Sequence, residues 1–429
     1  MPAHNRRGYQ VTGQSRPAST QRRGSTVTPA DSTGSRIPLY SREFATDPHG
    51  FYQWMRRRFG TLVPVDLAPG VPATLVVDDR TARRILDDPG HFPSDPRAWQ
   101  QKAPAGLPIV PMMHWRPNPL RTHGPDHDRY RAATVDALAG VDPNSLRTTV
   151  SRIAMDLINR FCSEGTADLL DRYVVPLVFR TMDDILGCPP ELGDRLYLAL
   201  TEMIDGAADD GSEPRIQRLL GELIAVKRAE PGDDVTSRLI RHPANLSDEE
   251  LVHQLLGLYW TGIEPPRNLI ANTLLLTLTD PRFTSDHTGF APPARDALDE
   301  VLASDPPLAN HSISYPPLPV MVDDVLLPAD QPVLIGATAC HGDPDRSTTP
   351  VPDEDRNLAW GRGAHACPVQ ARTISRLLAE EAVDQLLDAL PDLSPAFDPG
   401  RTIWRPGPFH RALIALPVRF PPAPGMPLG

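Results

Sequence analysis

A cysteine in a glycine-rich stretch, directly before a helix, has the surroundings expected of a metal ligand. The stretch LAWGRGAHACPVQA spans residues 358–371, and Pro368 suits the first helical position, where its missing N–H costs nothing. Cys367 therefore lies at a helix N-terminus, where the dipole and free amides stabilise an anion and predict a lowered thiol pKa. Gly361 and Gly363 permit positive φ in a loop that packs against a flat ligand. A thiolate held in this way is suited to ligate iron and to favour cleavage of an O–O bond.

Two other interpretations of Cys367 compete with metal ligation. A cysteine at a helix start is most often a small buried hydrophobic residue. A cysteine protease would need His365 as its base, but two positions along one loop is a poor geometry for that pair. No CxxC pair exists, so neither a zinc ribbon nor a disulfide scaffold is predicted, and a reducing cytoplasm is expected. The four cysteines are Cys162, Cys188, Cys340 and Cys367.

A second set of polar residues lies in the stretch PDHDRYR, residues 125–131. His127 and Arg131 are four positions apart and therefore share one face of a helix. Without the cysteine loop, a solvated basic face would be the favoured interpretation of this pair. His123 and His127 would suggest zinc ligands, but Pro125 lies between them and no third ligand is near, so we discount zinc.

A long central helix is the main element that must position these groups. The sequence SDEE from Ser247 has the form of a capping box, and apolar residues continue to about Leu278. About 30 residues at ~1.5 Å each give roughly 45 Å, enough to cross a whole domain. The adjacent prolines Pro265 and Pro266 remove two backbone hydrogen bonds, so the helix is predicted to open there. A simple kink without catalytic meaning is the alternative.

The remaining pattern is mostly helical, with a minor β-rich part near the N-terminus. A hairpin is predicted around Pro69-Gly70. Its strands occupy residues 62–77, and further short strands are expected at 320–327, 332–335 and in a terminal pair near 404 and 412–420. Helices are predicted at 51–59, 80–86, 126–138, 146–162, 166–186, 190–207 and 368–390.

The composition bounds the class of protein. The chain has 429 residues, of which 40% are hydrophobic, so it can form a sizeable core. A formal net charge of −11 argues against nucleic acid as the main partner. No run of ~18 apolar residues appears, so no membrane span is expected. Residues 1–36 lack an apolar signal segment and are predicted to be a disordered arm, followed by a single domain over 37–429.

The cysteine stretch resembles the haem-binding loop of the cytochrome P450 family, an aromatic residue followed by Gly-x-Gly-x-His-x-Cys. The resemblance extends from about Thr46 to Phe420 and implies the P450 fold with haem b as cofactor. It makes Cys367 the axial iron ligand. It also makes His127, Arg131 and His365 contacts of the haem propionates. The loop positions that match are Trp360, Gly361, Gly363, His365 and Cys367.

The central helix departs from the family's oxygen-activation motif. Thr261, Gly262 and Glu264 stand in the matching stretch and are the catalytic candidates that the resemblance implies. Pro265 replaces the threonine whose hydroxyl, together with the acid, delivers protons during oxygen activation. We expect Glu264 to relay protons, and a substrate hydroxyl or a bound water to replace the missing threonine.

The family's Glu-x-x-Arg helix also differs. Glu300 matches the acid, but Ala303 takes the place of the arginine that normally locks the cysteine side of the haem pocket. We expect Arg346 or Arg356 to compensate for the lost arginine. Val369 replaces a glycine, and Ser314 stands roughly where another propionate-binding arginine is expected. In this set of losses the chain resembles an atypical actinobacterial branch of the family.

The leading hypothesis is a cytoplasmic haem-thiolate monooxygenase that inserts one oxygen atom from O2 into a small organic molecule, a secondary metabolite. The chain has no flavin or NAD motif, so electrons are expected from a ferredoxin and a ferredoxin reductase. The alternative is a haem-binding protein without oxygenase turnover, which acts as a partner or sensor. Peroxide-driven or redox-neutral haem chemistry is a third possibility.

Overall fold

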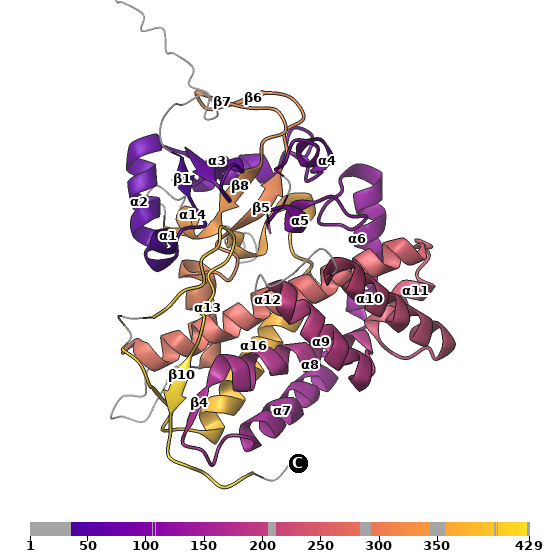
Figure 1. The fold of residues 1–429 in the computed structure, drawn as a ribbon, viewed down its shortest axis with the longest axis vertical. Helices are drawn as coiled ribbons and strands as arrows, with labels where there is room; N and C mark the ends of the chain where they lie inside the picture. The colour runs from indigo at the N-terminus through magenta and orange to yellow at the C-terminus, as the bar shows by residue number, and fades with distance from the viewer. Residues whose placement is uncertain are drawn as a thin grey trace, which may run out of the picture.

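The computed structural model of the chain describes residues 36–426, apart from residues 105, 108, 205–211, 284–292, 343–356, 399 and 401. All but one residue of the predicted arm over 1–36 therefore lie outside the described residues. The assignment of 37–429 to a single domain stays a prediction. In Figure 1 most helices gather in the lower part of the molecule, and a smaller part that contains the main sheet lies above them. The predicted architecture, mostly α with a β-rich N-terminal part, is confirmed.

The chain alternates short strands and helices at both ends, and its middle is helical apart from a short strand at Thr166–Asp168. The helices are α1 (Arg42–Thr46), α2 (Pro48–Phe59), α3 (Asp79–Leu86), α4 (Arg97–Gln100), α5 (Ile109–Met113), α6 (Gly124–Ala139), α7 (Pro143–Asn159), α8 (Val175–Leu186), α9 (Pro190–Ile204), α10 (Ser212–Ala229), α11 (Val235–Arg241), α12 (Asp248–Thr279), α13 (Ala294–Ser304), α14 (Ala337–His341) and α16 (Val369–Ala389). Short turns of other helix types are η1 (Leu170–Val174), η2 (Leu358–Trp360) and η3 (Gly363–His365). The strands are β1 (Ile37–Pro38), β2 (Leu62–Asp66), β3 (Pro72–Val76), β4 (Thr166–Asp168), β5 (Asn310–Ser314), β6 (Val320–Val322), β7 (Val325–Leu327), β8 (Val333–Gly336), β9 (Ser394–Pro395) and β10 (Pro417–Arg419).

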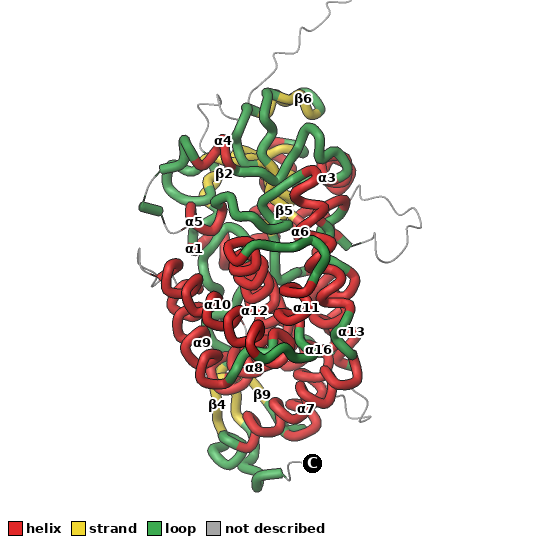
Figure 2. Tube along the Cα trace, turned by 90° about the vertical axis from the view of Figure 1, so that its right-hand side faces the viewer, coloured by secondary structure: helices red, strands yellow, loops and turns green. Residues whose placement is uncertain are grey.

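The central helix α12 organises the helical part. Its start is fixed by the predicted capping box, because the Ser247 hydroxyl accepts from the Glu250 amide and the Glu250 carboxylate accepts from the Ser247 amide. The helix packs against α8, α10, α13 and α16, and Figure 2 shows it in the middle of the helical part. Its 32 residues correspond to a length of about 48 Å. Groups along one side of α12 can therefore face a site deep inside the molecule.

The main sheet lies in the upper part of the molecule in Figure 1 and has the strand order β1-β2-β3-β8-β5. The predicted hairpin is present: β2 and β3 pair antiparallel, with Leu62 opposite Val76 and Asp66 opposite Pro72. β3 then pairs parallel with β8, and β8 pairs antiparallel with β5. The sheet thus joins the N-terminal hairpin to the segment that precedes the cysteine loop.

Two predictions about the helices need correction. The structure does not show the opening predicted at Pro265 and Pro266, because α12 continues through both prolines as one α-helix. Each proline removes a single bond, and fully buried neighbours such as Ile263 and Ile270 keep the helix packed on both sides. The helix predicted over 166–186 instead begins with strand β4 and a π-helical turn before α8. Among the described residues, no helix is long and apolar enough to span a membrane.

Candidate functional site

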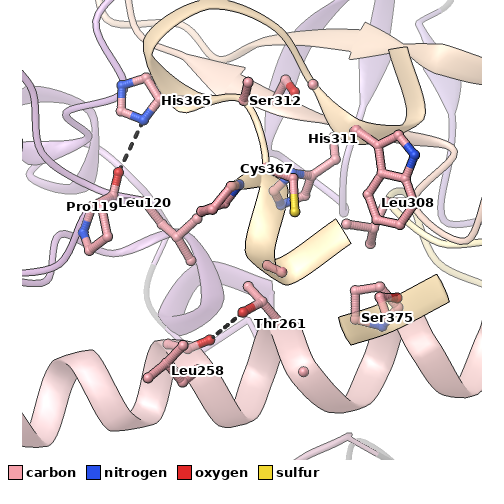
Figure 3. Close-up of a pocket in the computed structure, with 18 of the residues that line it drawn as sticks. Pro119, Leu120, Leu258, Thr261, Leu308, His311, Ser312, His365, Cys367 and Ser375 are labelled. Atoms are coloured by element: carbon pink, nitrogen blue, oxygen red, sulfur yellow. Dashed lines mark hydrogen bonds between the residues drawn. The ribbon is translucent and has the colours of Figure 1, made fainter. Parts of the chain in front are cut away.

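The loop that carries Cys367 folds back on itself through a short network of backbone bonds. The Cys367 amide donates to the Trp360 carbonyl at 2.7 Å. Gly361 has φ 68° and Gly363 has φ 70°, so both adopt the positive φ that the sequence predicted. A Cβ at Gly363 would lie 2.4 Å from the Leu86 carbonyl oxygen, so only glycine fits there. These bonds and the two glycines hold the loop at the start of α16, and Figure 3 shows Cys367 in this loop.

The thiol of Cys367 does not have the lowered pKa that its place at a helix N-terminus predicted. Burial raises the pKa of the Cys367 thiol to about 11, and the nearby cations Arg372 and Arg131 offset only part of this. The expectation was wrong because it weighed the helix dipole but not desolvation. A metal ion at the sulfur would remove the proton outright, so the thiolate depends on ligation and not on the helix.

Arg131 and His365 line one end of the cavity, and His127 does not line it but packs against His365. The rings of His127 and His365 lie 4.4 Å apart, centroid to centroid. Arg131 donates to the Ala366 carbonyl at 2.6 Å, and His365 Nδ1 donates to the Pro119 carbonyl at 3.0 Å. Burial lowers the pKa of His365 to about 4, and the charges of His127 and Arg131 act in the same direction. An anionic ligand at this end would oppose that shift.

The opposite wall of the cavity is the middle of α12. In Figure 3 the sulfur of Cys367 points into the cavity, and Thr261 lies on the helix across from it. Thr261, Gly262 and Pro265 all line the cavity, and the Thr261 hydroxyl donates to the Gly257 carbonyl at 2.8 Å. A Cβ at Gly262 would lie 2.4 Å from the Met182 methyl carbon, so a larger residue there would require the flexible Met182 side chain of α8 to move.

Glu264 lies on α12 but is not among the residues that line the cavity in the described part of the chain. Its buried carboxylate pairs with Arg405, accepts from Asn268 at 3.0 Å and lies 3.6 Å from Arg267. Burial alone would raise the pKa of Glu264, but Arg405 and Arg267 lower it below its usual value. The carboxylate is therefore ionised and held toward the C-terminal segment. Its role as proton relay stays a prediction, without a direct path into the cavity in this conformation.

The loop before Cys367 is joined to α13 through neutral groups. Glu300 lies at the surface of α13, 3.3 Å from Arg282. The expected compensators Arg346 and Arg356 lie outside the described residues. Asn357 donates to the Leu302 carbonyl of α13 at 3.0 Å and accepts from the Ala359 amide at 2.8 Å.

Two residues at the site were missed by sequence reasoning. Arg121 lines the cavity next to the His365 end, and Asn357 joins the cysteine loop to α13. Neither lies in a motif with a fixed spacing to Cys367. For Arg121, an arginine in an apolar, proline-rich segment just before the His127 helix was a signal that could have been used.

Comparison with curated proteins finds bacterial cytochromes P450. The chain is 28% identical over 396 residues to cytochrome P450 107B1 of Saccharopolyspora erythraea, covering 88% of this chain and 96% of that protein. It is 29% identical over 395 residues to the cytochrome P450 monooxygenase PikC of Streptomyces venezuelae, covering 88% and 92%. It is 26% identical over 379 residues to the mycinamicin IV hydroxylase/epoxidase of Micromonospora griseorubida, covering 81% and 90%. A comparison with protein-family models finds no match.

Solved structures agree with this result. CYP154C4 from Streptomyces sp. superposes with a TM-score of 0.78 at 25% identity, covering 90% of this chain and 98% of that one. The expected P450 fold is therefore confirmed, and haem is the cofactor of this group of proteins.

The residues around the cavity fit a haem. Cys367 offers a sulfur ligand to iron from one wall, and the facing side of α12 is lined by uncharged groups. The buried Nε2 of His127 has no hydrogen-bond partner among the described residues. It lies against His365 and one turn from Arg131, so a carboxylate at this end would satisfy it. Cys367 would hold the iron, and His127, Arg131 and His365 would hold the propionates.

Proposed function

Because this chain is a homologue of the bacterial cytochromes P450 and shares their fold, we propose that it inserts one oxygen atom from O2 into a small organic molecule. The observation that carries this proposal is the position of the Cys367 sulfur in a cavity whose opposite wall is the Thr261 turn of α12. When bound, the haem supplies the activation of dioxygen.

We assign the direct proton-holding role to the Thr261 hydroxyl. Thr261 is one helical turn before Pro265, so it lies on the same side of α12 as the residue that lacks a hydroxyl. Pro265 has no N–H, which leaves the Thr261 carbonyl without its usual helical donor. Hydroxyl and carbonyl together can hold a water or a substrate hydroxyl at the cavity wall. Gly262 keeps this turn close to α8, and Glu264 anchors the back of the helix to Arg405.

The lining of the cavity favours a largely apolar substrate with a few polar groups. Met182, Ile185 and Leu258 contribute apolar surface, and Asn118 and Gln254 contribute amides. One relative is named mycinamicin IV hydroxylase/epoxidase, and another is named polyketide biosynthesis cytochrome P450 PksS. We therefore propose a secondary metabolite of the polyketide type as substrate class.

An oxygenase that uses O2 needs electrons, and the sequence contains no flavin or NAD motif that would supply them. We propose a ferredoxin and its reductase, in agreement with the general use of redox partners by related proteins. A cytoplasmic location is part of the proposal, since the four cysteines are free thiols and suit a reducing compartment.

The proposal is tested with purified holoprotein, a surrogate ferredoxin and reductase, NADPH and a panel of macrolide and polyketide metabolites under ¹⁸O2. We expect substrate-dependent NADPH consumption and a product that carries one ¹⁸O atom. Product formation only with added peroxide would replace the oxygenase proposal by peroxide-driven chemistry. Haem binding without product under either condition would favour the non-catalytic alternative. Pro265, which stands where the family has a threonine hydroxyl, agrees with that alternative.

A further inference from the structure

Positive charge accumulates at one end of the cavity, where the segment before α6 meets β5 and the cysteine loop. Arg121, Arg131 and His365 line the cavity here. Within the described part of the chain, no aspartate or glutamate lines this cavity. A cavity wall with two guanidinium groups, those of Arg121 and Arg131, and no acid is expected to take an anionic ligand.

Arg121 is the positively charged residue at this end of the cavity that no known motif explains. Its guanidinium donates to the Met112 carbonyl at 2.9 Å and to the Leu120 carbonyl at 3.3 Å. Within the described residues it has no carboxylate partner. Burial lowers the pKa of Arg121, and Arg116 adds to the effect. By contrast, Arg116 of the same segment pairs with Glu213 at 2.8 Å. A half-buried guanidinium bound only to carbonyl oxygens lacks the anion that would offset its desolvation.

Arg121 lies at the end of the cavity where the sequence lacks an expected arginine. Ser314, at the end of β5, stands roughly where an arginine for a haem propionate was expected. The hydroxyl groups of Ser314 and Tyr315 are buried and have no hydrogen-bond partner among the described residues. Arg121 lies close enough for its charge to act on both His311 and Tyr315, so it reaches the same end of the cavity from another element.

We infer that Arg121 is an additional anchor of a haem propionate and takes the place of the arginine missing at Ser314. The inference rests on the proposed function, because it requires a bound haem. Arg121 would hold one carboxylate, and His127 with Arg131 would hold the other. The carbonyls of Met112 and Leu120 fix the direction of the guanidinium, which leaves its remaining N–H groups for the ligand.

The test compares Arg121→Gln, Arg121→Lys and, as a matched control, Arg97→Gln, whose side chain is 61% exposed and pairs with Asp95. The rate of haem transfer from holoprotein to excess apomyoglobin is measured for each. A hydrogen bond to a charged group is worth about 1.5–3 kcal/mol, which corresponds to roughly 10- to 100-fold faster haem loss in Arg121→Gln. Arg121→Lys should restore part of the retention, and Arg97→Gln should match the wild type.

Two further measurements separate an anchor from a structural residue. The reduction potential of the Arg121→Gln holoprotein should become more negative, because a cation near the haem that favours the added electron is gone. Thermal unfolding of the apoprotein should be unchanged or shifted upward, since an uncompensated buried cation has been removed.

Haem transfer from Arg121→Gln at the wild-type rate would show the inference to be wrong, and so would an equal loss of stability in apoprotein and holoprotein. A wild-type protein that retains no haem at all would instead contradict the proposed function itself.

Discussion

The cysteine loop, residues 357–368, and the middle of α12, residues 261–266, form two walls of one cavity but are held in different ways. The loop is bound from several other elements: Arg131 of α6, the Pro119 carbonyl before α6, Arg372 of α16 and the Leu302 carbonyl of α13. The middle of α12 has fewer such bonds. The Thr261 hydroxyl bonds within its own helix, two prolines donate nothing, and Glu264 pairs away from the cavity.

The loop therefore serves to hold the cofactor, and the middle of α12 serves the reaction that the cofactor performs. A loop fixed by bonds from four directions can keep one sulfur in place whatever happens on the facing wall. A helix turn that has exchanged a hydroxyl and two backbone donors for two prolines depends on fewer groups for proton delivery. We therefore expect variants of the loop to change haem ligation and variants of α12 to change turnover, with little overlap.

The largest effect is expected at Cys367. Cys367→Ala should abolish the far red-shifted Soret band of the reduced carbonyl complex, because the thiolate ligand is lost. Cys162→Ala, Cys188→Ala and Cys340→Ala should retain the band, since these thiols do not line the cavity. A thiolate spectrum that survives in Cys367→Ala would remove the basis of the comparison.

On the facing wall, Thr261→Val should lower product formed per NADPH by up to about 100-fold, the typical worth of a positioned proton donor. Valine keeps the branched shape, so the haem spectrum should not change. Thr261→Ser keeps a hydroxyl and serves as the control that should couple like the wild type. Unchanged coupling in Thr261→Val would show that this hydroxyl takes no part.

The next largest effect is expected from Asn357, whose hydrogen bonds join the loop to α13. Asn357→Ala removes two hydrogen bonds and leaves their partners unpaired, at a cost of about 1–3 kcal/mol, so roughly 5- to 150-fold less of the thiolate form should survive mild heating. Glu300→Gln should have little effect, because its pair with Arg282 is at the surface. The carbonyl-complex spectrum after incubation measures both. The reverse order of sensitivity would mean that Glu300 keeps the family's role.

The two walls also differed in how far the sequence could predict them. Ligands and glycines of the loop were recognised because their spacing is short and each residue type has one clear physical reason, as at Gly363. The direction of the Glu264 carboxylate was not predictable, since Arg405 lies 141 positions away and reaches α12 only through the fold. Asn357 was missed for the same reason, because the Leu302 carbonyl that it binds lies 55 positions away. The raised thiol pKa of Cys367 depends on burial, which no local pattern reveals.

His410, near Glu264 on the side of α12 that faces away from the cavity, should give a smaller, pH-dependent effect on the free energy of unfolding. Burial, followed by the charge of Arg405, lowers the pKa of His410 to about 4, although Glu264 acts in the opposite direction and Arg267 also faces it. The unfolded chain binds a proton on this histidine below ~6.5 and the folded protein only below about 4, so stability falls as the pH drops through this range. In urea unfolding of the apoprotein between pH 7 and pH 5, His410→Gln should flatten part of that fall. An equally steep fall in the variant would contradict the assignment.

The smallest single effect is expected from Pro265→Thr, and its dependence on Thr261 is what makes it informative. Threonine at 265 returns a hydroxyl and a backbone donor to the cavity wall, and α12 is already continuous there, so the helix needs no rearrangement. If Thr261 already holds the proton, the substitution should change product per NADPH little in the wild type. In the Thr261→Val background the same change should restore much of the lost coupling, because the new hydroxyl lies one turn away on the same side. This double-mutant cycle measures the interaction between the two positions directly. Equal improvement in both backgrounds would mean that the two hydroxyls act independently and that Thr261 does not replace the missing threonine.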